Sequence, residues 1–498
     1  MSIFRYTLWL HLLFLTPLLG ADHFLTIGGG YSPAGNQLSI ERNIHFYQRV
    51  IDGLGLGETP HDIYFADGNA PGRDVQFAPK ESNVPKAHRY LARFFGSEKY
   101  LDLQYRDHEL EGVEAMTSPE AIESWFKKKG AKLQSGDRLV IYATAHGGRS
   151  QDRKNPQNTK LYLWNTRPIY TSRFAELISE LPDGVSVVLI MAQCYSGGFA
   201  HVIFPSADER KGDQDRAIAG FFSTTHDRMA AGCTPDIDEE NYEEYSTHFW
   251  AALSGKSRTG KEIESPDYDG NGAVSFTEAH AYTFLESDTI DIPQKTSDAF
   301  LRKRSKFKDK DSPELLARET NFTEIEALAD PLQKILLERV SSTLELSGEK
   351  RVETAKKEAE EIAKKRKQLA DQDKVEKRNY DSAHREIRNA IAARWPEAVN
   401  VLKPESIALI TEKGDDLISL VENHPKFKAW SESKKKRDKI KEERFHLDKD
   451  WVLFQRFLVV SDSIVLAENL KRLDQPEKWE RYEELVRAEG GYLVPPGS

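Results

Sequence analysis

Residues 139–148 read LVIYATAHGG and residues 187–198 read VVLIMAQCYSGG, and these two stretches decide the fold. Each begins with an apolar run that is rich in β-branched residues, is long enough for a buried strand and ends abruptly in small polar residues. Open α/β sheets carry their chemistry just past the carboxyl ends of their strands. We therefore expect His146 and Cys194, which follow the two runs, to lie together at one edge of a sheet.

The chain around these runs alternates between strand and helix patterns from Phe24 to about Ser287. Further strands are predicted at 24–27, 63–66 and 219–223, and helices at 38–54, 119–129, 172–181 and 245–254. Such alternation predicts an α/β domain over residues 21–287, with a mainly parallel sheet flanked by helices. The polar stretch 69–114 gives no clear pattern.

The remainder of the chain is charge-rich and has a different character. Residues 288–322 are predicted to be a basic linker, and residues 323–498 an all-α region. Helices are expected at 323–346 (broken or kinked by Pro331), 349–395, 405–422, 426–444 and 448–470. The stretch 349–395 contains no Gly or Pro, which favours one long solvated helix. Apolar positions are too sparse to establish a coiled coil.

Composition and the N-terminus limit the class of protein. A net charge of −10 argues against nucleic acid or an anionic membrane as a general partner. The only cysteines are Cys194 and Cys233, which excludes a disulfide scaffold, and both are expected to be free thiols. Residues 1–20 carry Arg5 and an apolar run that is too short to span a bilayer, so they are predicted to be a signal peptide. We expect a secreted or periplasmic protein without a stable membrane span.

The residue types at the two strand ends suit nucleophilic catalysis. An imidazole near a thiol raises the thiolate fraction and can later protonate a leaving amine. The backbone N–H groups of Gly147 and Cys194 could together form an oxyanion hole. The sequence therefore predicts Cys194 as the nucleophile and His146 as its base.

These motifs resemble the legumain family of caspase-fold cysteine peptidases. The resemblance rests on His146-Gly147 after one apolar strand and on Cys194 with Ser196-Gly197 after the next, 48 residues from His to Cys, and it covers about residues 22–285. It implies a caspase-like fold and an endopeptidase that cleaves protein or peptide substrates through a thioester. It also implies substrate-binding roles for Thr224 and Ser246.

The chain departs from the legumain pattern at two places. Ala192 stands where legumains carry an acidic residue, which weakens any expectation of an asparagine or basic preference. The first turn is Gly28-Gly29-Gly30, whereas legumains have an asparagine there that orients the histidine. The third catalytic member is therefore open, and a backbone carbonyl could substitute.

A second motif, DYDGNGAVSFTE at residues 267–278, fits the twelve-residue calcium loop at every ligand position. The predicted ligands are the oxygen-bearing groups of Asp267, Asp269, Asn271, Ala273, Ser275 and Glu278. A helix is expected to leave this loop but none to enter it, so we predict one isolated structural Ca²⁺ site. A calcium-free turn rich in Asp and Asn is the alternative.

Two other function classes stay open. A transpeptidase or ligase would use the same dyad, with an amine intercepting the thioester. A non-catalytic binding or scaffold protein would use the helical region as its working part. By analogy with the legumain prodomain, that region is also a candidate for intramolecular inhibition, relieved by cleavage at 303–311, or for oligomerisation.

Overall fold

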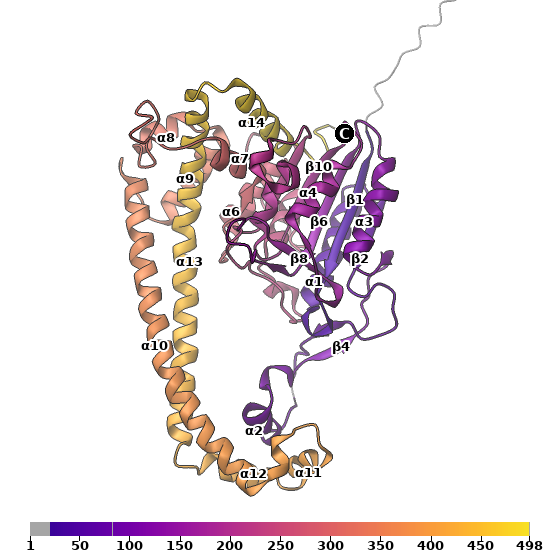
Figure 1. The fold of residues 1–498 in the computed structure, drawn as a ribbon, viewed down its shortest axis with the longest axis vertical. Helices are drawn as coiled ribbons and strands as arrows, with labels where there is room; N and C mark the ends of the chain where they lie inside the picture. The colour runs from indigo at the N-terminus through magenta and orange to yellow at the C-terminus, as the bar shows by residue number, and fades with distance from the viewer. Residues whose placement is uncertain (1–19, 82, 498) are drawn as a thin grey trace, which may run out of the picture.

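The computed structural model describes residues 20–81 and 83–497, so the predicted signal peptide lies outside the described residues except for Gly20. A seven-stranded sheet forms the centre of the fold, in the order β12-β11-β10-β6-β1-β2-β5 (Figure 1). Its strands are β1 (Asp22–Gly29), β2 (His61–Phe65), β5 (Val113–Ala115), β6 (Arg138–Ala145), β10 (Ser186–Met191), β11 (Ile218–Phe222) and β12 (Gln294–Lys295). All neighbours are parallel except β11 and β12. The predicted α/β class is confirmed.

Alternate residues of the central strands enter two separate cores. On one face Leu25 and Ile141 pack with α3 (Pro119–Lys128) and α4 (Thr171–Ser179). The other face packs against α1 (Leu38–Gly53), α5 (Tyr245–Ser254) and α6 (Phe276–Glu286). Covering both faces explains why these strands are continuously apolar rather than alternating.

The sheet domain extends past residue 287, into the range predicted to be a linker. β12 is its edge strand, and α7 (Thr296–Arg304) follows it directly. Phe300 and Leu301 of α7 lie in the same core as the sheet. We define the sheet domain as residues 20–77 and 105–304.

A projecting segment, residues 78–81 and 83–104, interrupts the sheet domain and is called the arm. It leaves and returns through β3 (Val75–Phe77) and β4 (Gln104–Arg106), which pair antiparallel. Its outer part is α2 (Lys86–Phe95). The sequence of this region gave no clear prediction because its elements are short.

Two long helices, α10 (Arg351–Arg394) and α13 (Phe427–Arg472), form a hairpin beside the sheet domain (Figure 1). Short helices α8 (Phe322–Leu328) and α9 (Pro331–Thr343) pack at its base, as the break at Pro331 predicted. The tip, residues 395–426, contains α11 (Pro404–Glu412) and α12 (Gly414–Glu422). The prediction of two helices over 426–470 is wrong. No Gly or Pro interrupts that stretch, and α13 is one helix of 46 residues.

The end of the described chain returns to the sheet domain. Helix α14 (Pro476–Glu489) places Leu485 in the first core, and Leu493 lies in the second. Glu489 is fully buried and accepts hydrogen bonds from the N–H and Oγ of Ser297, each at 2.7 Å. The sheet domain and the C-terminal helices therefore share their hydrophobic cores. Among the described residues, no helix is both long and apolar enough to cross a membrane.

Candidate active site

His146 and Cys194 lie at the same edge of the sheet because β6 and β10 are neighbours. The parallel register pairs Ala143 with Met191, and each candidate residue follows three positions after its member of this pair. This edge is at the lower side of the sheet domain in Figure 1, where β8 (Lys160–Leu163) lies. The predicted meeting of the two strand ends is therefore present in the fold.

The backbones after the two strands are in direct contact. A Cβ atom added to Gly147 would lie 1.8 Å from the carbonyl oxygen of Cys194. No side chain fits in that space, so glycine at 147 lets the histidine segment approach the cysteine segment closely. This is a steric reason for the His-Gly motif, in addition to the predicted role of its N–H group.

The N–H group of Gly147 faces away from its neighbouring strand. Residues 147–148 pair antiparallel with β8, and Gly147 lies opposite Leu161. The N–H of Tyr162 donates to the carbonyl of His146 at 2.9 Å, so His146 and Tyr162 form the hydrogen-bonded pair. Since such pairs alternate along an antiparallel ladder, the N–H of Gly147 points out of the ladder. It is positioned to donate to another group.

His146 is held by the segment between β1 and α1. Its Nε2 lies 2.7 Å from the carbonyl oxygen of Gly35 and 2.9 Å from Oε1 of Gln37. A carbonyl oxygen can only accept, so Nε2 carries the proton and Nδ1 is the basic nitrogen. Burial lowers the pKa of His146, and the hydrogen bond to Gly35 opposes this shift. The expected backbone-carbonyl substitute is thus present, whereas Gln37 was missed by sequence reasoning.

Cys194 lies at a sharp turn. The next residue, Tyr195, has φ = 60°, in the left-handed region that non-glycine residues rarely occupy. Its N–H donates to the carbonyl of Arg228 at 2.8 Å, and its carbonyl accepts from Oγ1 of Thr159 at 3.0 Å. These bonds fix the turn that presents the thiol.

Residues 225–233, which we call the covering loop, lie against the thiol. The N–H of Ala230 donates to Sγ of Cys194 at 3.3 Å, and the thiol lies 3.8 Å from the carbonyl oxygen of the same residue. The N–H of Ala231 donates to Oδ1 of Asp291 at 2.7 Å, which ties the loop to the segment before β12. Nothing in the sequence indicated that this loop would contact the cysteine.

Burial raises the pKa of the Cys194 thiol, and the nearby charge of Asp291 raises it further, while the hydrogen bond from Ala230 lowers it. Asp291 is itself buried, which raises its pKa to about 7. Burial thus favours the neutral thiol of Cys194 and the neutral imidazole of His146 over their charged forms.

The two predicted substrate-binding residues, Thr224 and Ser246, are buried. Thr224 supports the nucleophile turn through its backbone, because its carbonyl accepts from the N–H of Gly197 at 2.8 Å. Ser246 lies in the first turn of α5 and is 1% exposed. Neither side chain reaches the surface in this structure.

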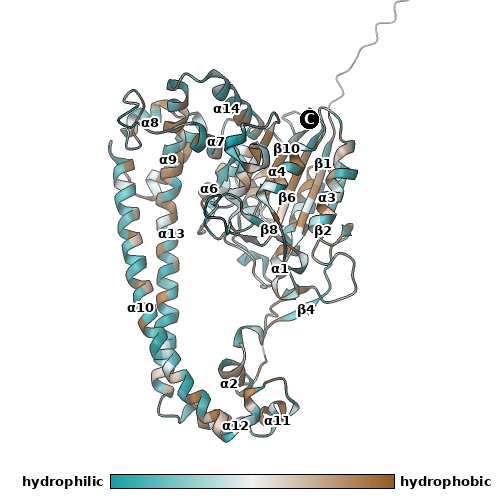
Figure 2. Ribbon diagram, viewed as in Figure 1, coloured by the Kyte–Doolittle hydropathy of each residue, from teal (hydrophilic) through white to brown (hydrophobic). Residues whose placement is uncertain are grey.

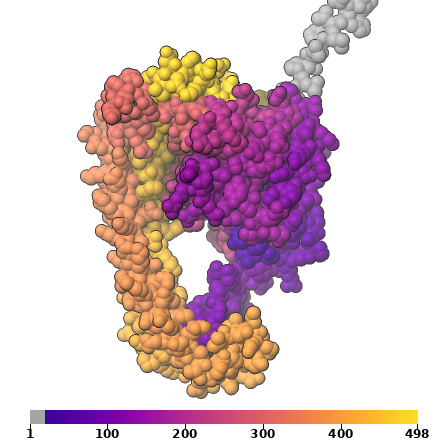
Figure 3. Space-filling view, viewed as in Figure 1, coloured from indigo at the N-terminus to yellow at the C-terminus, as the bar shows by residue number. Residues whose placement is uncertain are grey.

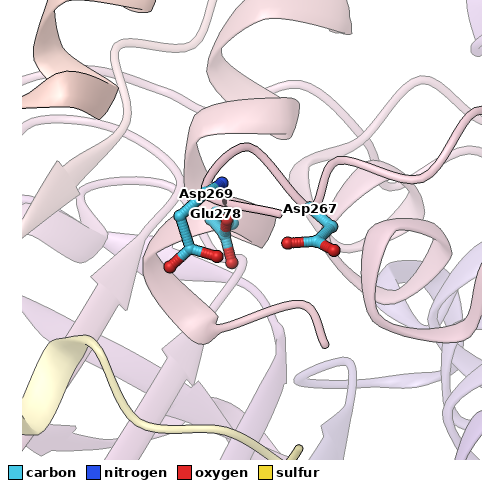
Figure 4. Close-up of side chains that lie close together, drawn as sticks. All are labelled: Asp267, Asp269 and Glu278. Atoms are coloured by element: carbon cyan, nitrogen blue, oxygen red, sulfur yellow. Dashed lines mark hydrogen bonds between the residues drawn. The ribbon is translucent and has the colours of Figure 1, made fainter. Parts of the chain in front are cut away.

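The calcium-loop residues converge at the start of α6. Ligand atoms of Asp267, Asp269 and Glu278 all lie within 4.8 Å of one another, and Figure 4 shows Asp267 facing the other two carboxylates. Carboxylate oxygens are the ligands that Ca²⁺ prefers, so this donor set fits the ion. Ala273 is the position that would offer its carbonyl; its N–H donates to Oδ1 of Asn271 at 3.0 Å.

Hydrogen bonds give the loop its shape. Ser275 is the N-cap of α6 and forms a capping box with Glu278, whose carboxylate also accepts from the N–H of Tyr268 at 2.8 Å. The side chain of Asn271 donates to the phenol oxygen of Tyr492 at 2.8 Å. The loop is thereby joined to the C-terminal segment, which the sequence did not indicate.

No family model matches the chain, and no curated protein matches it. Among solved structures, the crystal structure of protein GSU0716 from Geobacter sulfurreducens is similar with a TM-score of 0.31 and 11% identity, over 55% of this chain and 92% of that one.

Proposed function

We propose that this protein is a cysteine endopeptidase in which Cys194 attacks the scissile carbonyl and His146 is the base. The observation that carries the proposal is the direct contact between Gly147 and the backbone of Cys194. It brings a histidine with a basic Nδ1 and a cysteine at a tight turn to one edge of a parallel sheet. The motif resemblance to legumains supports the same conclusion.

In this reaction Nδ1 of His146 takes the thiol proton as Sγ bonds to the carbonyl carbon. The oxygen then carries negative charge, which the N–H groups of Gly147 and Cys194 can stabilise. The N–H of Cys194 donates to no other residue among those described. Collapse of the intermediate breaks the C–N bond and transfers the proton to the leaving amine. Water then hydrolyses the thioester.

The covering loop has to shift for this chemistry. The backbone of Ala230 occupies both the donor and acceptor positions on the thiol. A substrate chain that lies against Cys194 would replace these contacts. We infer that substrate binding displaces residues 229–231 from the sulfur.

We further propose that the acidic loop binds one Ca²⁺ ion in a structural role. Asp267, Asp269 and Glu278 would hold the ion, which would neutralise three converging carboxylates. The loop precedes α6 and contacts the C-terminal segment, so the ion would stabilise the junction between them. The apolar run in residues 8–19 supports secretion to a compartment where calcium is available.

The test is hydrolysis of a mixed fluorogenic peptide library by the full chain, by Cys194→Ala and His146→Ala, and by Cys233→Ala as the matched cysteine control. Loss of cleavage in the first two variants and its retention in the third would support the dyad. Adding an amine nucleophile and analysing products by mass spectrometry separates hydrolysis from ligation. A folded chain that neither cleaves peptides nor labels at Cys194 with an electrophilic peptide would favour the binding-protein alternative.

A further inference from the structure

The hairpin, tip, arm and sheet domain together form a closed ring. Figure 3 shows an opening through the molecule, bounded by the hairpin on one side and by the sheet domain and arm on the other. The ring closes twice, once where the hairpin base meets the sheet domain and once where the tip meets the arm. Both closures consist of specific packed contacts.

At the tip, α2 of the arm shares a hydrophobic cluster with the ends of both long helices. The phenol of Tyr90 donates to Glu422 at 2.8 Å, and the same carboxylate pairs with Lys86. The guanidinium of Arg93 lies 5.3 Å from the ring centre of Trp430 on α13. The arm is therefore fastened to the hairpin although it is far from it in sequence.

At the base, α13 is anchored by a buried cation. Arg456 is fully buried and donates to the carbonyl oxygens of Phe284, Ser287 and Asp291, at 2.8–2.9 Å. The hairpin base also shares a hydrophobic cluster with α6, α8 and α9. The base is thus held to the sheet domain by buried hydrogen bonds and by apolar packing.

Between the two closures the hairpin stands away from the sheet domain. Figure 2 shows this part as mostly hydrophilic, whereas the sheet and both ends of the hairpin are more apolar. Its few buried apolar side chains include Leu369 on α10 and Ile440 on α13, two helices that pack along each other. Within the described chain, no hydrogen bond or ion pair joins residues 427–447 to the sheet domain. A helix of 44 residues is about 66 Å long, so the hairpin spans this distance as a stiff rod.

The candidate active site lies on the inner margin of this ring. On one side, the guanidinium of Arg228 in the covering loop pairs with Asp448 at 3.2 Å and lies 4.8 Å from the ring centre of Trp451, both on α13. On the other side, the arm begins beside the residues that hold His146. The N–H of Gln76 donates to the carbonyl of Asn36, and the N–H of Ala78 to that of Pro235. The nucleophile is flanked by α13 and by the root of the arm.

We propose that the substrate is an extended polypeptide segment that threads through this ring to reach Cys194. This inference rests on the proposed peptidase function and names its substrate class. An unfolded chain with a free end can enter the opening of the ring and reach Cys194. A segment with a folded domain at each end has no free end to insert, so it cannot enter while the ring is closed. The hydrophilic middle of the hairpin suits a chain that must slide past it rather than adhere.

The first experiment places the best library sequence in a long flexible chain and compares three substrates. The first has two free ends, the second has one end fused to a stably folded domain, and the third has both ends fused to such domains. Wild type should cut the first two at similar kcat/KM and the doubly capped chain at least about tenfold more slowly. Leu91→Asp combined with Glu422→Lys, which puts a charge into the cluster of the tip and breaks its contact with Lys86 and Tyr90, should restore cutting of the doubly capped chain. Its hydrolysis of a short peptide should match wild type, as should that of Glu412→Lys on α11. Equal cutting of all three chains by wild type would overturn the threading proposal.

The second experiment does not depend on hydrolysis. Cys194→Ala is mixed with an unfolded chain that has one folded end and a biotin at the other. Streptavidin added after mixing should trap the complex against dilution, whereas streptavidin added before should prevent its formation. If the order of addition makes no difference, or if no complex forms in either order, threading is contradicted. A chain that traps substrate but cleaves no short peptide would instead contradict only the peptidase function.

Discussion

The carbonyl oxygen of Gly35 lies 2.7 Å from Nε2 of His146, so a backbone atom from the loop before α1 sets the tautomer of the candidate base. The side chain of Gln37 contacts the same nitrogen at 2.9 Å. With Nε2 protonated, Nδ1 has the lone pair that can accept a proton. No third side chain is therefore needed to set this tautomer.

The burial of His146 and Cys194 predicts how peptide hydrolysis and thiol alkylation depend on pH. Burial lowers the pKa of His146 below its usual 6.5, so the basic form persists to lower pH. The acid limb of kcat/KM should therefore fall below pH 6.5, because activity is lost as His146 becomes protonated. Burial also raises the pKa of Cys194 above 9.0, so the rate of alkylation by iodoacetamide should still be rising at pH 9. An acid limb above pH 6.5 would contradict the neutral-pair interpretation.

The meeting of His146 and Cys194 could be predicted from the sequence, whereas the groups that surround them could not. Two buried runs that each end in a reactive residue are sufficient to expect neighbouring strand ends. The partner of His146 is a carbonyl oxygen, which every residue has, so no residue type marks it. Ala230 likewise touches Cys194 through backbone atoms.

Gly147 offers a steric test of the site. In Gly147→Ala the new Cβ would meet the carbonyl oxygen of Cys194 at 1.8 Å, so one of the two segments must move. Displacing the oxyanion donor should reduce kcat about 100- to 1,000-fold, the range seen for loss of one donor. Gly148→Ala is the matched control. Its Cβ would meet the ring of Tyr162, which can rotate away, so most of the activity should remain. Equal kinetics for Gly147→Ala and wild type would show that the contact does not matter.

The calcium loop predicts a ligand-dependent gain in stability. Calcium at 100 times its Kd should raise the free energy of unfolding by about 2.7 kcal/mol. Asp267→Asn and Glu278→Gln remove charge from the converging carboxylates and should weaken or abolish this gain. Glu264→Gln, an exposed acid just before the loop, should leave the gain unchanged. Thermal unfolding with calcium, magnesium and chelator measures each case. A gain of the same size in Asp267→Asn would place any bound ion elsewhere.

In the C-terminal region, local sequence patterns predict the helices but not the residues against which they pack. Its helices follow from composition, and the break at Pro331 was predicted. Their packing depends on single residues that return to the sheet from far along the chain. Glu489 is 192 residues from Ser297, and Arg456 is 165 residues from Asp291, so neither partner could be read from spacing.

These long-range contacts predict that the C-terminal helices are needed for the sheet domain to fold. Glu489 is buried and accepts two hydrogen bonds from Ser297 and one from the partly exposed ammonium of Lys295. Glu489→Ala leaves that cation without its partner and should cost about 3–5 kcal/mol of the free energy of unfolding. Glu484→Ala, which removes a half-exposed partner of Arg481, should cost at most about 1 kcal/mol. Urea unfolding followed by far-UV circular dichroism measures both.

The same contacts bear on activation by cleavage. A chain ending at Arg304 lacks α14 and Leu493, which complete the two cores, and should be unfolded rather than more active. A chain with an inserted protease site at 309–311, cut after folding, keeps these helices bound and should retain its stability. A soluble, more active chain ending at Arg304 would instead support the inhibitory-tail interpretation, because it would show that the sheet domain folds alone and that the helices restrain it.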